Sequence, residues 1–161
     1  MNIEILCIGG LKEPWLKEAE KEYTKRLKPY VKINITELNE TRLPKNAGPA
    51  EEEFVKSEEG KTLLTYIEKN EDAFIYALDM RGKQLTSEEF SEQMKGHAIN
   101  GRSKIIFIIG GSLGLSEKVR KKAGFVLSFS EMTYPHQMAR IMLLEQLYRS
   151  QKIIRGEPYH K

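Results

Sequence analysis

Two loops, each following an apolar strand, carry the residue types best suited to hold a ligand. A glycine loop with Gly110, Gly111 and Gly114 follows the β-branched run 105–109, and a polar loop follows the apolar run 125–129. Glycine lets the backbone approach a ligand closely. Loops that follow parallel strands lie at the same edge of a sheet, where α/β proteins bind ligands. We therefore expect the function at this edge.

The spacing of the glycines limits which ligand the loop can take. Aligned on Gly111 and Gly114, the dinucleotide fingerprint would need its first glycine at Ile109, so the fingerprint is broken. Glu131 nevertheless lies about where a ribose-binding acid would fall, which keeps a nicotinamide or flavin enzyme open. No Gly-Lys-Ser/Thr is present, so a phosphate-cradling loop is excluded. An adenosine without phosphates, as in S-adenosylmethionine, fits this chemistry.

The bulk composition fits one globular domain without a membrane span. The chain has 161 residues, of which 40% are hydrophobic and 30% charged. Its apolar runs are far shorter than a membrane requires, and its N-terminus lacks the basic region of a signal peptide. Cys7 is the single cysteine, and no Cys/His spacing indicates a metal. We expect a cytoplasmic protein without metal, whose net charge of +3 is compatible with a nucleic-acid partner but does not demand one.

Hydrophobic periodicity and capping signals predict alternating strands and helices over residues 1–161, hence a mostly parallel α/β sheet with helices on both faces. Pro14 and Pro135 begin helices, a Thr86–Glu89 capping box begins another, and Ser116 caps a short one. The predicted strands are 3–8, 31–38, 72–80, 105–109 and 125–129, and the predicted helices are 14–27, 50–68, 86–97, one after Ser116 and one after Pro135. A tight turn is predicted at 81–82, and the loop 39–50 is read as a plain connection rather than a lid.

The last helix is apolar over more than one face. Its residues 141–144 are four apolar residues in a row. Such a helix is buried on more than one side. We infer that a second subunit covers it; the alternative is a helix sunk in the core of its own chain.

The segments FIIGGSLGL and LSFSEMTYPHQMARIMLLEQLYRSQKIIRGEPYHK resemble the ribosomal RNA large subunit methyltransferase H (RlmH) family of the SPOUT superfamily, and the similarity covers the whole chain. The resemblance implies a single domain with a deep trefoil knot in about residues 104–161. It also implies a homodimer with its active site at the subunit interface, and S-adenosyl-L-methionine as cofactor. The implied reaction is methylation of N3 of a pseudouridine in helix 69 of 23S rRNA on assembled ribosomes.

The resemblance also implies which residues bind the cofactor. Leu78 would be an apolar wall, and Gly110 and Gly111 would admit the cofactor because they lack Cβ atoms. Backbone groups of the following loop would hold the adenine. Within that loop, Thr133 would either bond the ligand or cap the next helix, and Glu131 is a neighbour without an assigned role. The implied loop residues are Phe129, Ser130, Glu131, Met132, Thr133 and Tyr134.

The implied catalytic residues are Tyr159 and His160, donated across the dimer to assist loss of the N3 proton. Arg155 and Lys161 would bind rRNA phosphates. Of the other histidines, His97 is expected to be structural, and His136 either structural or a ligand contact. Arg140 and Arg149 are weaker RNA candidates, because charges on a helix usually face solvent. A non-enzymatic ribosome-associated factor remains the other alternative.

Overall fold

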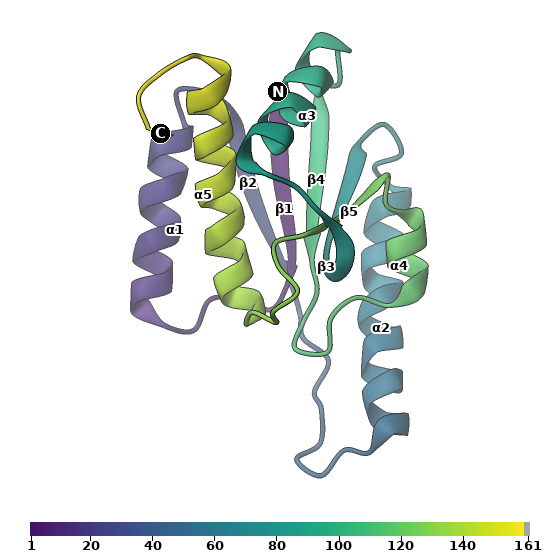
Figure 1. Cartoon of the computed structure of the whole chain (residues 1–161). Coiled ribbons are helices and arrows are strands. Elements are labelled where there is room, and N and C mark those ends of the chain that lie inside the picture. The colour runs from purple at the N-terminus through teal and green to yellow at the C-terminus, as the bar shows by residue number, and fades with distance from the viewer. Residues whose placement is uncertain (160–161) are drawn as a thin grey trace.

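A computed structural model describes residues 1–159, which fold into five strands and five helices in strict alternation (Figure 1). The strands form one all-parallel sheet with the order β2-β1-β4-β3-β5. They are β1 (Asn2–Ile8), β2 (Lys32–Leu38), β3 (Phe74–Gln84), β4 (Lys104–Ile109) and β5 (Phe125–Ser128). The helices are α1 (Pro14–Leu27), α2 (Pro49–Glu68), α3 (Ser87–Ile99), α4 (Glu117–Lys122) and α5 (His136–Ile154).

The helix starts follow the predicted capping signals. Thr86 accepts a hydrogen bond from the Glu89 amide at 3.1 Å, and the Glu89 carboxylate accepts one from the Thr86 amide at 2.8 Å. Ser116 accepts a bond from the Val119 amide at 3.4 Å and so caps α4. The order of elements, the parallel sheet and the edge position of β2 are confirmed.

The predicted tight turn at Arg81-Gly82 is wrong. β3 continues through this pair to Gln84, and its register against β5 shifts between Leu78 and Lys83. An Arg-Gly pair is typical of a turn by its local preference, but here it lies in an irregularity of the strand, because Leu78 before it and Lys83 after it both pair with Leu127 of β5. A Cβ atom on Gly82 would lie 2.5 Å from the carbonyl oxygen of Val126, so only glycine fits this close approach.

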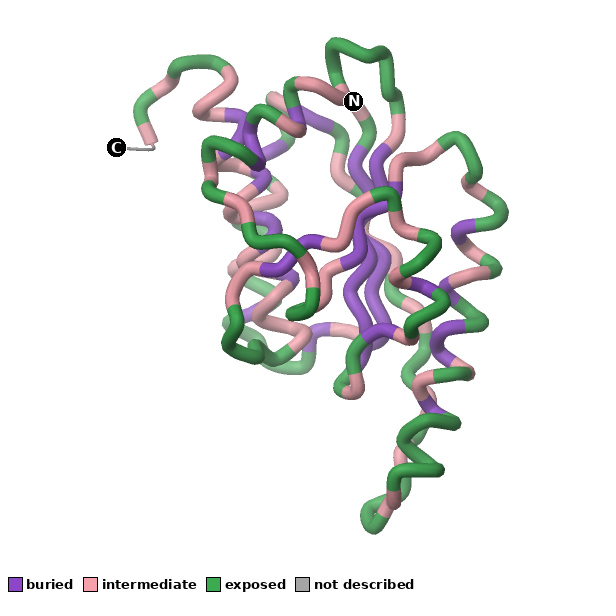
Figure 2. The backbone as a smooth tube through the Cα atoms, turned by 45° about the vertical axis from the view of Figure 1, so that its right-hand side comes forward, coloured by how far each residue is buried: buried purple, intermediate pink, exposed green. Residues whose placement is uncertain are grey.

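The helices form two layers that bury opposite faces of the sheet. α1, α3 and α5 cover the face to which Ile3, Ile5 and Phe107 belong, and α2 and α4 cover the face of Leu6 and Ile108. Figure 2 shows the buried strands in the middle of the molecule and an exposed arm, the 39–48 loop with the first turns of α2, projecting from it.

The last helix lies between two others of its own chain. α5 packs against both α1 and α3, and Leu143, Leu144 and Leu147 are fully buried among them. The apolar run 141–144 is therefore largely covered within one subunit, which was the alternative to coverage by a partner. To reach this place from β5, the chain crosses the link between β3 and α3 (Figure 1).

Arg140 does not lie on a solvated helix face, contrary to expectation. Its side chain is 1% exposed. The guanidinium donates to Glu20 at 3.0 Å, to Glu37 at 2.6 Å and to the Gly9 carbonyl at 2.9 Å. It therefore joins α5 to α1, to β2 and to the loop after β1.

No helix among residues 1–159 combines the length and apolar character that crossing a membrane requires.

Replacing Arg140 with Met should lower the free energy of unfolding by about 3 kcal/mol, because the Gly9 carbonyl and two carboxylates lose a buried donor. Urea denaturation measures this. Arg26→Met is the matched control, since Arg26 pairs with Glu22 at the surface and its loss should barely move the midpoint. Equal effects of the two substitutions would contradict the anchoring role.

Gly82→Ala should destabilise the protein by about 2–3 kcal/mol, because the new methyl group meets the backbone of β5. Gly96→Ala serves as the control in α3. A Cβ there has no heavy atom within 4 Å, so the change should be neutral or stabilising by up to about 1 kcal/mol. Thermal unfolding of both variants distinguishes a local clash from a general sensitivity to alanine.

Candidate functional site

A pocket of about 630 Å³ opens beside residues 78–81 of β3 and at the carboxyl ends of β4 and β5. It brings together most of the residues that the sequence assigned to a cofactor: Leu78, Gly110, Gly111, Phe129, Ser130, Met132, Thr133 and Tyr134. Glu131 is exposed and does not line the pocket. One strand and two loops thus form one concave site, although the residues are up to 56 positions apart (Leu78 to Tyr134).

The glycine loop after β4 is held by its own backbone. Gly114 has φ +75°, and its amide donates to the Gly111 carbonyl at 3.0 Å. A Cβ on Gly110 would lie 2.8 Å from the backbone of Gly114, and one on Gly111 would lie 2.9 Å from the carboxylate of Glu59. Gly110 is therefore needed for the loop to close on itself, whereas Gly111 leaves room for the Glu59 side chain of α2.

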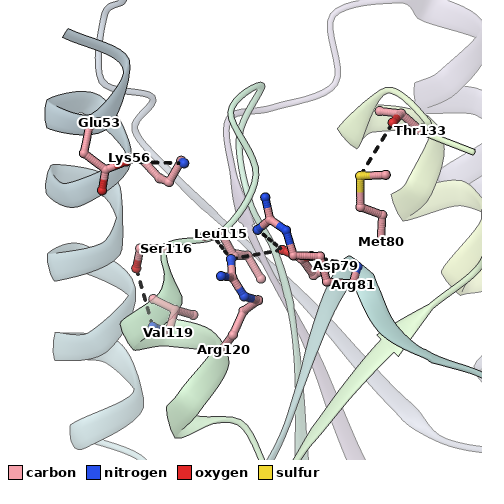
Figure 3. A network of polar contacts seen from close by, with 10 residues as sticks. All are labelled: Glu53, Lys56, Asp79, Met80, Arg81, Leu115, Ser116, Val119, Arg120 and Thr133. Atoms are coloured by element: carbon pink, nitrogen blue, oxygen red, sulfur yellow. Dashed lines mark hydrogen bonds and ion pairs between the residues drawn. The ribbon is translucent and has the colours of Figure 1, made fainter. Parts of the chain in front are cut away.

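Serine side chains shape the loop after β5, which forms the wall opposite the glycine loop. The Ser128 hydroxyl donates to the Ser130 carbonyl at 2.9 Å and accepts from the Ser130 amide at 3.3 Å. The Ser130 hydroxyl accepts from the Met132 amide at 3.0 Å. Thr133 does not cap α5, whose N-cap is Pro135; its hydroxyl instead contacts the Met80 sulfur at 3.7 Å (Figure 3). Short hydrogen bonds to its own backbone therefore hold this wall.

An ion pair that the sequence reading did not single out joins two walls of the pocket. Asp79, at the end of the buried part of β3, lies 3.4 Å from Arg120 of α4, and Arg120 donates to the Leu115 carbonyl at 2.5 Å (Figure 3). Asp79 also accepts from the Arg81 amide at 3.0 Å. This pair ties the glycine loop to β3. Leu78 was assigned from the resemblance; Asp79, next to it and near the end of the predicted strand 72–80, could have been found from the rule that ligands bind at strand ends.

His136 lies in the first turn of α5 and lines the pocket. Its buried Nε2 makes no hydrogen bond within the described residues, and the nearest ion-pair partner is Glu40 at 3.6 Å. Burial lowers the pKa of His136, and the Glu40 carboxylate opposes this only in part. Glu40 belongs to the 39–48 loop, so that loop reaches the rim of the pocket.

Of the C-terminal residues that the structure describes, Arg155 and Tyr159 do not line the pocket of their own chain. The Tyr159 hydroxyl donates to Glu145 at 3.1 Å, and its ring lies against Tyr148 and Arg149. Arg155 lies over the Tyr30 ring at 4.7 Å. α5 runs from the pocket toward the other end of the molecule (Figure 1). His160 and Lys161 lie outside the described residues.

Residues 1–159 contain no group of three or more His, Cys, Asp or Glu side chains that could hold a metal ion.

Comparison with known proteins places the chain among methyltransferases. The family described as "Predicted SPOUT methyltransferase" matches residues 1–160. A protein of Clostridium botulinum (strain Okra / Type B1) is 51% identical over 161 residues, and one of Clostridium kluyveri (strain NBRC 12016) is 48% identical over 161 residues. A protein of Clostridium novyi (strain NT) is 49% identical. All three are named ribosomal RNA large subunit methyltransferase H, and each alignment covers 100% of both chains.

The two histidines that the structure describes, His97 and His136, should titrate below the ordinary histidine pKa of 6.5, because burial disfavours their charged forms. The unfolded chain then binds protons more readily than the folded one. Stability should be at its full value above pH 6.5 and decrease as the pH falls through the lowered pKa values. NMR titration of the imidazole protons measures the pKa values, and urea unfolding at several pH values measures the slope. Values at or above 6.5 would contradict the burial effect.

Proposed function

The chain belongs to the SPOUT methyltransferase family, and on this basis we propose that it transfers a methyl group from S-adenosyl-L-methionine to a base of ribosomal RNA. Membership implies the C-terminal trefoil knot, which the crossing of the β5–α5 and β3–α3 connections accommodates. The observation that carries the proposal is the convergence of β3, the glycine loop after β4 and the loop after β5 on one pocket, in a chain about half identical to named rRNA methyltransferases.

The pocket fits an adenosine without phosphates. Leu78, Ile109 and Leu127 supply an apolar floor, and the glycine and serine loops present backbone groups at its sides. Among the described lining residues, only Asp79, Arg81 and His136 have charged or imidazole side chains. We infer that Leu78, Gly110, Gly111 and residues 129–134 hold the cofactor, which supplies the reactive methyl group. These residues contribute by orienting it, and alignment of reacting groups is worth about 7–11 kcal/mol of the barrier.

The substrate we propose is N3 of a pseudouridine in helix 69 of 23S rRNA on assembled ribosomes. The N3 proton must leave during the transfer, and the imide loses it only well above neutral pH. A base near N3 or a donor to the developing oxyanion therefore assists. We assign this role to the Tyr159–His160 pair. Burial raises the pKa of the Tyr159 phenol, so in its present position the phenol stays protonated and acts as a donor.

The pair would act across a homodimer. Tyr159 is held against α5 of its own chain by Glu145, away from the residues that line the pocket. An active site built from one subunit's pocket and the partner's tail would reconcile the role assigned to Tyr159 with its position away from its own pocket. Arg155 and Lys161, in the same tail, would then contact rRNA phosphates beside the target, in a cytoplasmic enzyme acting on ribosomes.

Labelled S-adenosylmethionine tests the proposal directly. Intact ribosomes that lack the modification should become labelled, with free 23S rRNA as the control. Ribosome binding without label would favour the non-enzymatic factor. Thermal stabilisation by NAD and not by S-adenosylmethionine would favour the nicotinamide enzyme, since a ligand at 100 times its dissociation constant adds about 2.7 kcal/mol.

Deletion of residues 157–161 should leave S-adenosylmethionine binding nearly intact and abolish methylation, because Tyr159 is held by Glu145 outside the residues that line the pocket of its own chain. Calorimetry measures binding, and label incorporation measures activity.

A mixed dimer tests donation across the interface. One subunit lacks 157–161, and the other has an intact tail but a pocket filled by Leu78→Trp. Each homodimer should be inactive and the mixed dimer active. Retained activity in the tail-deleted homodimer, or an inactive mixed dimer of folded subunits, would contradict the tail's role.

A further inference from the structure

The mouth of the pocket gathers exposed apolar side chains. Six large hydrophobic side chains of the described residues are exposed, and three of them line this pocket: Met80, Met132 and Tyr134, at 52%, 72% and 39%. Met80 comes from β3, and the other two come from the loop between β5 and α5. The Thr133–Met80 contact joins the two sides. Apolar surface at the rim of a concave site marks a place where a partner molecule docks.

A cation lies within the same rim. Arg81 lines the pocket, and its side chain is 62% exposed. Its guanidinium makes one ion pair within residues 1–159, with Asp79 at 3.9 Å. Asp79 is already engaged by Arg120 at 3.4 Å and by the Arg81 amide. The Arg81 guanidinium is therefore open to an external anion.

We propose that this mouth, formed by Met80, Arg81, Met132 and Tyr134, grips the RNA strand around the target nucleotide. The Tyr134 ring and the Met132 side chain stack on an unpaired base, and Arg81 binds the adjoining phosphate. The assignment rests on the proposed function. In this assignment the side chains of the mouth contact the RNA, while the backbone of the loop between β5 and α5 faces the cofactor.

The chemistry of the substrate favours this occupant. A nucleobase must leave its stack before its ring nitrogen can enter a pocket, and unstacked bases are held on aromatic side chains. A phosphate follows each base, and arginine matches its oxygens with paired donors. A second copy of the chain would be a poorer occupant, because an apolar subunit interface would bury the Arg81 charge with only a shared carboxylate to pair it.

Binding measurements on full-length dimers test the proposal. Tyr134→Ala should weaken ribosome binding about tenfold and Tyr134→Phe should restore it, since stacking on an aromatic ring contributes about 1–3 kcal/mol per base. Arg81→Gln should weaken binding by roughly five- to tenfold and reduce the slope of log affinity against log salt by about 0.7–1. Lys61→Gln is the matched control, because Lys61 is similarly exposed, at 69%, and pairs with Glu58 on α2. S-adenosylmethionine affinity should stay within about twofold in Arg81→Gln and Lys61→Gln.

Any of the following results would contradict the assignment of this mouth to RNA. Unchanged ribosome affinity in both variants would show that the mouth does not touch RNA. Dissociation of the dimer, measured by light scattering, would assign the mouth to a subunit interface, and a parallel loss of S-adenosylmethionine affinity would assign it to the cofactor. An inactive wild type would remove the proposed function together with this inference, whereas an active wild type with unaffected variants would remove this inference alone.

Discussion

The buried guanidinium of Arg140 is the contact on which the arrangement of the site depends. It reaches the Gly9 carbonyl after β1, Glu37 on β2 and Glu20 on α1. Arg140 lies one turn after His136, so the same contact fixes the start of α5 and the end of the loop that forms one wall of the pocket. The neighbouring Cys7 stays a neutral thiol, because burial raises its pKa to about 12. Arg140 and the neighbouring Cys7 therefore form a structural anchor and not a nucleophilic centre.

The pocket walls, by contrast, are shaped mainly by backbone conformation. The glycine loop closes through a Gly114–Gly111 bond, and the serine loop through short side-chain bonds to its own backbone. Such local bonds hold a loop in one conformation before a ligand arrives, so that little ordering entropy is lost on binding. The Asp79–Arg120 pair, together with the bond from Arg120 to the Leu115 carbonyl, joins β3 to the end of the glycine loop.

Tyr159 lies apart from the ligand pocket of its own chain. The pocket lies at the start of α5, while Tyr159 is held by Glu145 at the middle of this helix. The nine residues from His136 to Glu145 span about 13 Å of helix. This separation is the reason for proposing an active site that combines the pocket of one chain with the tail of another.

Much of the fold follows from local sequence. Caps at Thr86 and Ser116, the proline at Pro14 and the period of apolar residues predict each element to within a few positions, because these signals act through hydrogen bonds between near neighbours. The strand-end rule likewise predicts the edge where the pocket lies. Two readings failed for one reason. Arg81-Gly82 was read as a turn and Arg140 as a surface charge, and both depend on partners far along the chain.

The sequence by itself therefore determined the alternation of strands and helices, the ligand-binding edge and, through its long C-terminal motif, the family. Only the tertiary structure decided that Gly82 passes against β5, that Arg140 is buried between carboxylates, and that Asp79, Arg81 and His136 share the pocket with the expected loops. The physical reason is that local signals report bonds made within a few residues. Burial and charge pairing depend instead on which distant segments the packed chain brings together.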